Sequence, residues 1–192
     1  MTIGPWTVLE ERPLMRTKWL DARVETCRTP SGHVVDDYTV LHYTDWSVAV
    51  AITTDNRLVM TRQWREGAQA ISLECAGGVV DLGEKSELAA ARELLEETGY
   101  RGTLAGPVLK VRPNPATQRN WFYATLFTDC TRVANPVEDA TEVLEVSLMS
   151  GDEVMAAITS GELIHGLQVA TILMTLNLRP DLLENTPQEI RT

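Results

Sequence analysis

Hydrophobic and polar residues alternate near the start of the chain in a way that predicts a β-hairpin. The alternation runs from Trp19 to Cys27 and is typical of a half-exposed strand. Thr29-Pro30-Ser31-Gly32 has proline and glycine where a tight turn favours them, and His33 to Tyr43 follows as the second strand. Residues 3–12 mix apolar and charged side chains, and we expect a short strand or arm there.

The rest of the chain mixes short apolar runs with longer helical patterns. We expect strands at residues 47–53, 58–62, 70–75, 103–111, 120–128 and 142–149. We expect helices at residues 86–98, 151–160 and 167–178. This order predicts an α/β (α+β) fold, a sandwich in which helices flank a mixed sheet, preceded by an antiparallel β arm.

The helix at residues 86–98 has two faces of opposite character. Ser86 can cap its start, and Gly99 is the usual residue for a left-handed stop. Helical spacing gathers one apolar stripe for burial, made of Leu88, Ala91, Leu94, Leu95 and Thr98. The opposite face carries Glu93, Glu96 and Glu97.

Two roles suit such an acidic face. It is either an ordinary solvated surface, or a site for hard divalent cations such as Mg²⁺ or Mn²⁺, which prefer oxygen ligands. Arg92 lies four residues before Glu96 and can pair with it. Gly77-Gly78 and Gly83, which precede the helix, allow the backbone to turn tightly and to approach it closely.

Composition narrows the class of protein. The 192 residues suffice for one domain of good size, and no apolar run approaches the length of a membrane span. Cys27, Cys75 and Cys130 have unrelated spacings, which favours the reducing cytoplasm over a disulfide framework. The net charge of −10 argues against a nucleic-acid surface, but not against a nucleotide held through bound cations.

The segment from Leu73 to Gly102 resembles the signature of the Nudix hydrolases. The match comprises Gly78, Glu84, Arg92, Glu93, Glu96, Glu97 and Gly99, with Tyr100 where relatives usually carry an aliphatic residue. The resemblance implies a sheet flanked by helices, a bound divalent metal, and hydrolysis of a nucleoside diphosphate linked to another group. It also implies that Glu93, Glu97 and the Gly77 carbonyl hold Mg²⁺ (Mn²⁺ is an alternative), with Glu96 in support, and that Arg92 is one of the catalytic residues.

The N-terminal hairpin resembles the β arm of the branch that hydrolyses ADP-ribose and nucleoside-diphosphate sugars. In that branch the arm exchanges between two subunits, which implies a homodimer. We therefore expect residues 1–46 to form a dimerisation arm and residues 47–192 the catalytic domain. Arg62-Gln63-Trp64-Arg65 and Leu73-Glu74 resemble two further segments of the same branch, with Cys75 and Ala76 replacing an aliphatic-Pro-Ala portion.

Four residues are candidates for substrate binding by this resemblance: Trp19, Arg65, Glu74 and Pro115. Trp19 would stack on a base, and dimer packing is its alternative role. Arg65 would bind a phosphate or the sugar, and a surface salt bridge is its alternative. Pro115 lies fifteen residues beyond Tyr100, as in ADP-ribose pyrophosphatases, but Ala116 follows where relatives carry glycine.

The general base is expected near the strand at residues 142–149. Glu142 resembles the glutamate that this branch supplies there, and Glu138, Asp139 and Glu93 are the alternatives. The histidines at positions 33, 42 and 165 are isolated, and we expect them to be satisfied structural residues. Cys75 has no neighbouring base in sequence, which disfavours it as a nucleophile.

The predicted function is Mg²⁺-dependent cleavage of the diphosphate bond of ADP-ribose or a related nucleoside-diphosphate sugar. The products would be a nucleoside monophosphate and a sugar phosphate. GDP-mannose, ADP-glucose or a broad range of nucleotide sugars are alternative substrates. A different class of protein is also considered, a Nudix sensor that binds nucleotide sugars without cutting them, but the acidic positions it would have lost are all present.

Overall fold

The structure, a computed structural model, describes residues 3–137 and 143–183 and divides into two compact units. One unit comprises the residues up to Asp45 together with Val111–Trp121. The other comprises Trp46–Lys110 and the chain from Phe122 onward. The segment Val111–Trp121 thus groups with the N-terminal residues, whereas the sequence placed it within the second domain.

The first unit is a three-stranded antiparallel sheet with the order β1-β2-β3. Its strands are β1 (Thr7–Arg16), β2 (Asp21–Arg28) and β3 (Val34–His42). The predicted turn closes the β2–β3 hairpin, where the N–H of Gly32 donates to the carbonyl of Thr29 at 2.9 Å. β1 is an edge strand, and all ten of its residues are exposed.

The second unit contains a seven-stranded sheet. Its main path has the order β10-β5-β4-β9-β8, with β6 paired to β5 and β7 paired to β4. The strands are β4 (Trp46–Thr53), β5 (Leu58–Arg65), β6 (Ala70–Glu74), β7 (Gly77–Val79), β8 (Tyr100–Val111), β9 (Phe122–Arg132) and β10 (Glu145–Met149). β4 and β9 are parallel, whereas the pairs β10–β5, β4–β5, β4–β7 and β5–β6 are antiparallel, which confirms the predicted mixed sheet.

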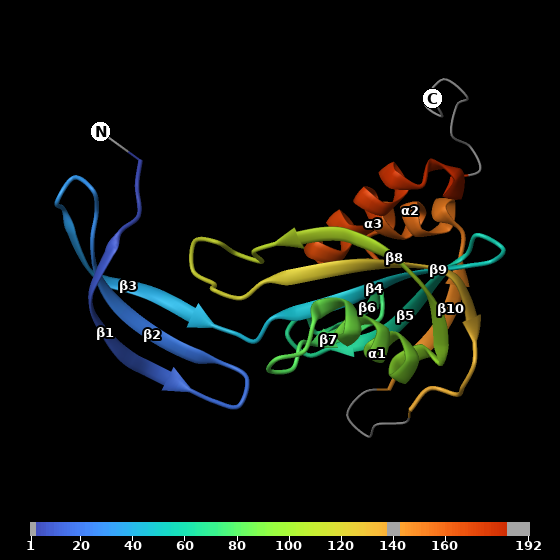
Figure 1. Cartoon of the computed structure of the whole chain (residues 1–192), viewed down its shortest axis with the longest axis horizontal. Coiled ribbons are helices and arrows are strands. Elements are labelled where there is room, and N and C mark those ends of the chain that lie inside the picture. The colour runs from blue at the N-terminus through green and yellow to red at the C-terminus, as the bar shows by residue number, and fades with distance from the viewer. Residues whose placement is uncertain (1–2, 138–142, 184–192) are drawn as a thin grey trace. The chain divides into compact units, whose positions relative to one another are not determined.

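Helices cover both faces of this sheet (Figure 1). α1 (Ser86–Thr98) lies on one face, whereas α2 (Gly151–Ser160) and α3 (Gly166–Leu178), followed by the short 3₁₀ helix η1 (Pro180–Leu182), lie on the other. The core beneath α1 is built from small and medium side chains, including Ala49, Ala51, Ala76, Ala90 and Leu94. Within the described residues, no helix is long and apolar enough to cross a membrane.

α1 has the predicted bounds but differs in two details. Lys85, not Ser86, is the N-cap, and no side chain caps this end; the Ser86 hydroxyl instead donates to Glu87. Leu88 is 58% exposed, while Ala89 and Ala90 are buried. The buried face is therefore rotated toward the two alanines, because their small side chains let α1 approach the sheet closely.

Gly99 ends α1 as predicted, in the left-handed conformation with a φ of 74°. A Cβ atom at this position would lie 2.1 Å from the carbonyl oxygen of Ala134. Gly83 has a similar φ of 82°, but a Cβ atom there would meet nothing within 4 Å. These two glycines share the backbone constraint and differ only in the space around them.

We predict that Gly99→Ala destabilises the protein more than Gly83→Ala. The shared left-handed conformation costs an alanine about 1–2 kcal/mol at either position. Only Gly99→Ala adds an overpacking cost of about 1–3 kcal/mol, because a backbone carbonyl must move. Urea denaturation of both variants measures the difference, and equal losses would contradict the tight contact with Ala134.

Candidate active site

The site is organised around a glycine backbone that passes very close to its neighbours. Gly77 in β7 pairs with Val48 in β4, and a Cβ atom on Gly77 would lie 2.5 Å from the carbonyl oxygen of Ser47. A Cβ atom on Gly78 would lie 2.4 Å from Oε1 of Glu93 in α1. At Gly77 the near atoms include backbone, which leaves no room for a side chain, whereas at Gly78 they belong to the end of the Glu93 side chain; both glycines bring bare backbone up to the acidic side of the helix.

Two of the three glutamates predicted to lie at the metal site are held against this glycine backbone. The Glu93 side chain is 14% exposed and its carboxylate lies beside Gly78. Glu97 is 7% exposed, and its Oε2 accepts a hydrogen bond from the N–H of Gly77 at 3.0 Å. Glu96 is 48% exposed. Of the three glutamates, only Glu96 is therefore exposed as an ordinary solvated surface residue would be.

Arg92 joins the loop before α1 to the acidic face of the helix. Its guanidinium donates two hydrogen bonds to Glu84, at 3.2 and 3.1 Å, and one to the carbonyl of Val79 at 3.0 Å. It also donates to Glu93 at 2.7 Å and to Glu96 at 3.3 Å, the second being the predicted pair. These bonds lower the pKa of Glu84 and raise that of Arg92. Arg92 therefore positions several carboxylates at once.

The donor set suits a hard divalent cation. Glu93 and Glu97 present carboxylate oxygens from one face of α1, one turn apart and against the glycine backbone. Oxygen donors of this kind are what Mg²⁺ and Mn²⁺ prefer. The structure shows the N–H of Gly77 in contact with Glu97, and the role of the Gly77 carbonyl as a ligand stays a prediction.

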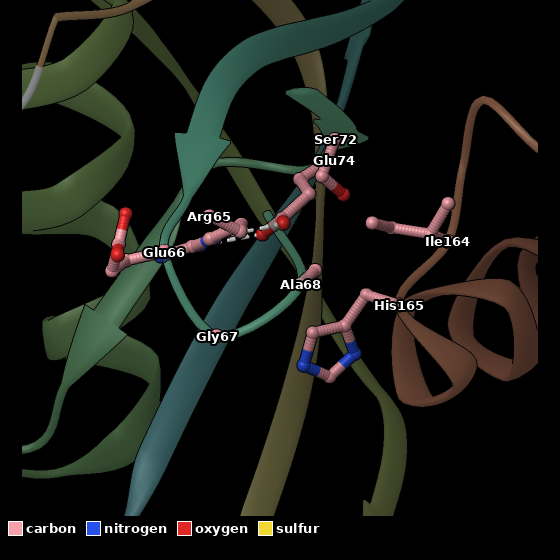
Figure 2. Close-up of a pocket in the computed structure, with 8 residues that line it drawn as sticks. All are labelled: Arg65, Glu66, Gly67, Ala68, Ser72, Glu74, Ile164 and His165. Atoms are coloured by element: carbon pink, nitrogen blue, oxygen red, sulfur yellow. Dashed lines mark hydrogen bonds and ion pairs between the residues drawn. The ribbon is translucent and has the colours of Figure 1, made fainter. Parts of the chain in front are cut away.

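Arg65 and Glu74 form a second polar cluster in the same unit, on β5 and β6 (Figure 2). Nε and Nη2 of Arg65 donate to the two oxygens of Glu74, at 2.8 and 2.5 Å. Glu74 is fully buried, and its Oε2 also accepts from the amide of Gln168 at 2.9 Å. Arg65 thus pairs with a buried carboxylate, and its contact with substrate stays a prediction.

Gln168 was missed by the sequence analysis. It is fully buried in α3, ninety-four residues from Glu74, and its Oε1 accepts from the N–H of Cys75. The available signal was an amide near the start of the apolar run at residues 167–178, because a buried polar side chain needs a hydrogen-bonding partner.

The remaining predicted residues lie elsewhere. Trp19 is 60% exposed in the turn before β2, where Nζ of Lys18 lies 4.3 Å from its ring centroid. Pro115 is exposed, and both tryptophan and proline belong to the first unit. Glu142 and its alternatives Glu138 and Asp139 lie outside the described residues.

Cysteine and histidine residues give one confirmation and one correction. Burial raises the pKa of Cys75 to about 12, which agrees with its predicted lack of nucleophilic character. The expectation of satisfied histidines is wrong for His42 and His165. Nε2 of His42 and Nδ1 of His165 are buried and have no hydrogen-bonding partner among the described residues.

The first unit holds another group of possible metal ligands, Glu11, Glu25 and His42, whose ligand atoms lie within 4.8 Å of one another. Arg23 already pairs with Glu11, and Arg119 pairs with Glu25 at 2.8 Å. Because the guanidinium groups neutralise both carboxylates, this group offers a cation little net negative charge.

Comparisons with known proteins agree with this geometry. The profile described as NUDIX domain matches residues 44–167, and the nucleoside diphosphate sugar hydrolase N-terminal domain matches residues 6–41. The ADP-ribose pyrophosphatase of Bacillus subtilis (strain 168) is 25% identical over 178 residues, covering 89% of this chain and 95% of that protein. The CMP-5'-(N-acetyl-N-hydroxy-3-aminopropyl)phosphonate hydrolase of Streptomyces rubellomurinus is 27% identical over 175 residues, covering 90% of this chain and 83% of that protein.

A solved structure shows the same fold. The crystal structure of an ADP compounds hydrolase superposes with a TM-score of 0.80 over 94% of this chain and 97% of that chain, at 17% sequence identity. This likeness confirms the predicted sandwich of helices around a mixed sheet.

We predict that alanine at Gly77 lowers the stability of the protein, whereas alanine at Gly78 lowers its affinity for a metal ion. Gly77→Ala should destabilise the fold, because its Cβ would meet the backbone of Ser47 and Val48 at 2.5 and 2.7 Å. Gly78→Ala meets only the flexible end of Glu93, so stability should stay near that of the wild type while the carboxylate is displaced. Mn²⁺ affinity should then fall about 10-fold or more in Gly78→Ala.

Calorimetric titration with Mn²⁺ and urea denaturation measure the two quantities. Unchanged Mn²⁺ affinity in Gly78→Ala would contradict a role for Glu93 at a metal site.

Proposed function

We propose that this chain, which belongs to the NUDIX domain family of hydrolases, cleaves the diphosphate bond of ADP-ribose or a related nucleoside-diphosphate sugar. The reaction gives a nucleoside monophosphate and a sugar phosphate, and it requires Mg²⁺, which Mn²⁺ can replace. The observation that carries the proposal is the pair of carboxylates, Glu93 and Glu97, held against the bare backbone of Gly77 and Gly78.

Glu93 and Glu97 would hold the divalent cation, with Glu96 and the Gly77 carbonyl completing the set. When bound, the cation supplies neutralisation of phosphate charge and lowers the pKa of the attacking water. Arg92 holds Glu93 by the 2.7 Å bond from Nη1, so the carboxylate keeps its place beside Gly78 in the free protein. This arrangement reduces the reorganisation that binding would otherwise require.

The proton of the attacking water goes to a carboxylate. Glu142 is the proposed general base on sequence grounds, and it lies outside the described residues. Glu93 is the alternative, but its Oε1 is already bonded to Arg92, and its proposed place is in the metal site. A base that is separate from the metal ligands could accept the proton without loosening the cation.

Two comparisons support a nucleotide-sugar substrate. The N-terminal profile carries the name of nucleoside diphosphate sugar hydrolases, and the relative from Bacillus subtilis is named an ADP-ribose pyrophosphatase. Trp19 is 60% exposed, and stacking of its ring on a base stays a prediction. GDP-mannose and ADP-glucose stay as alternatives. The non-hydrolysing sensor is disfavoured, because all the acidic positions of the site are retained.

The first unit is proposed to form a homodimer. Every residue of β1 is exposed, and four of its apolar side chains are 43–57% exposed: Val8, Leu9, Leu14 and Met15. An edge strand of this length with apolar side chains is a surface that proteins usually cover. Cytoplasmic location stays a prediction from the cysteine pattern.

We predict that Glu97→Gln lowers kcat/KM for ADP-ribose roughly 100-fold or more, because one charged metal ligand is lost. Folding should be retained, since a glutamine oxygen can still accept the hydrogen bond from Gly77. Glu87→Gln, in the first turn of the same helix, is the matched control and should retain full activity.

A panel of nucleoside-diphosphate sugars, coupled to a phosphatase that releases phosphate from the products, gives the rates. Wild-type activity in Glu97→Gln, or no turnover of any substrate by the wild type, would refute the proposal.

We predict that the wild type sediments with a mass near twice 21.3 kDa. Leu14→Glu should give monomers, because it places a charge on the exposed strand β1. Leu178→Glu, at an equally exposed apolar residue at the end of α3, is the control and should leave the dimer intact. A monomeric wild type would overturn this assignment.

A further inference from the structure

A cavity of about 460 Å³ lies between the β5–β6 hairpin and the start of α3 (Figure 2). Its wall includes the Arg65–Glu74 pair, the hairpin turn, and the residues that lead into α3. The lining residues are Arg65, Glu66, Gly67, Ala68, Ser72, Glu74, Ile164 and His165. Neither Ser72 nor His165 has a role in the cleavage chemistry described above.

Two polar atoms in the residues that line this cavity have no hydrogen-bonding partner within the described part of the chain. Ser72 is fully buried, yet its hydroxyl makes no hydrogen bond to any described residue. Nδ1 of His165 is also buried and makes no hydrogen bond to any described residue; the His165 ring packs against Trp46 with centroids 5.0 Å apart. A buried polar group without a partner costs about 1–3 kcal/mol, so two in one cavity indicate a ligand that supplies the missing bonds.

The charges of the cavity favour a neutral ligand over an anion. Arg65 and Glu74 neutralise each other in a two-bond ion pair. Glu66 points away from the other lining residues in Figure 2, and its carboxylate accepts from Trp64 at 2.8 Å. Burial lowers the pKa of His165 below its ordinary value, which favours the neutral form of its ring. No unpaired positive side chain is left among the lining residues to attract phosphate.

Hydroxyl groups match the unpaired atoms of the cavity. A hydroxyl both donates and accepts, so it can satisfy the Ser72 oxygen and a neutral imidazole nitrogen whichever tautomer is present. α3 begins at Gly166 without a side-chain cap, and its first N–H groups suit a further oxygen. We therefore propose that this cavity binds the hydroxyl-bearing sugar of the nucleoside-diphosphate sugar, with Ser72 and His165 as the residues that select it.

The position of the cavity fits a substrate that also reaches the acidic site. Glu74 in the cavity wall and Gly77 beside Glu97 are three residues apart in the chain, a span of at most ~11 Å. A diphosphate and its sugar extend over a comparable length. This assignment rests on the proposed function, because it identifies the bound hydroxyls with those of the substrate.

Variants of the two residues test the proposal with a matched pair of substrates. One substrate is the nucleoside-diphosphate sugar that the wild type prefers, and the other is the methyl ester of the same nucleoside diphosphate, which lacks the sugar. Ser72→Ala and His165→Phe should each lower kcat/KM about 10-fold for the sugar substrate and leave the methyl ester unaffected. His165→Phe keeps the aromatic contact with Trp46, and His165→Asn should restore part of the loss.

Stability separates this role from a structural one. Ser72→Ala should unfold at the same or a higher temperature than the wild type, because the lost hydroxyl has no bond to lose. Ser160→Ala, whose hydroxyl donates to the carbonyl of Ala157 at 3.2 Å outside the cavity, is the control for both assays. Equal losses on both substrates, or a lower melting temperature in Ser72→Ala, would overturn the proposal.

Binding of sugar alone gives a readout that needs no hydrolysis. Saturation-transfer NMR with D-ribose, D-glucose and D-mannose, without divalent cation, should show transfer to at least one sugar in the wild type and none in the Ser72→Ala, His165→Phe double variant. No transfer to any sugar would overturn the cavity assignment. Absence of hydrolysis with transfer retained would instead overturn the proposed function and leave the sugar-binding cavity supported.

Discussion

The close passage of the Gly77–Gly78 backbone between β4 and α1 is the constraint on which the site depends. Side chains at these two positions would collide with the Ser47 carbonyl and with the Glu93 carboxylate. Because they are absent, Glu97 can reach the N–H of Gly77, and a carboxylate that would otherwise be costly to bury is satisfied. On the acidic face of α1, the carboxylate oxygens of Glu93 and Glu97 are therefore held in fixed positions against the glycine backbone.

Arg92 gives this set its rigidity and also limits its charge. Five hydrogen bonds from one guanidinium join the loop at Val79 and Glu84 to the helix at Glu93 and Glu96. The negative charges of Glu93 and Glu96 repel each other, and the positive charge of the Arg92 guanidinium, which bonds to both, offsets that repulsion in the free protein. Loss of Arg92 would therefore disturb both the contact between the loop and the helix and the placement of the proposed metal ligand Glu93.

Much of the fold followed from local patterns, and the errors came from contacts between distant residues. The helix Gly151–Ser160 has its predicted bounds, because Ser150 and Glu153 form a capping box within a few residues. Ser86 does not cap α1, and Leu88 is exposed, because packing on the sheet decides both. Gln168 lies ninety-four residues from Glu74, so no periodicity could reveal that bond.

The parallel pairing of β4 with β9 has a consequence for the order of folding. Trp46 pairs with Phe122, so the sheet cannot close until the intervening seventy-five residues, including α1, have left the ribosome. Antiparallel neighbours such as β5 and β6 need only a short turn and can form earlier. A nascent chain that stops before Phe122 would lack the strand that pairs with β4 and would present β4 as an open edge to chaperones.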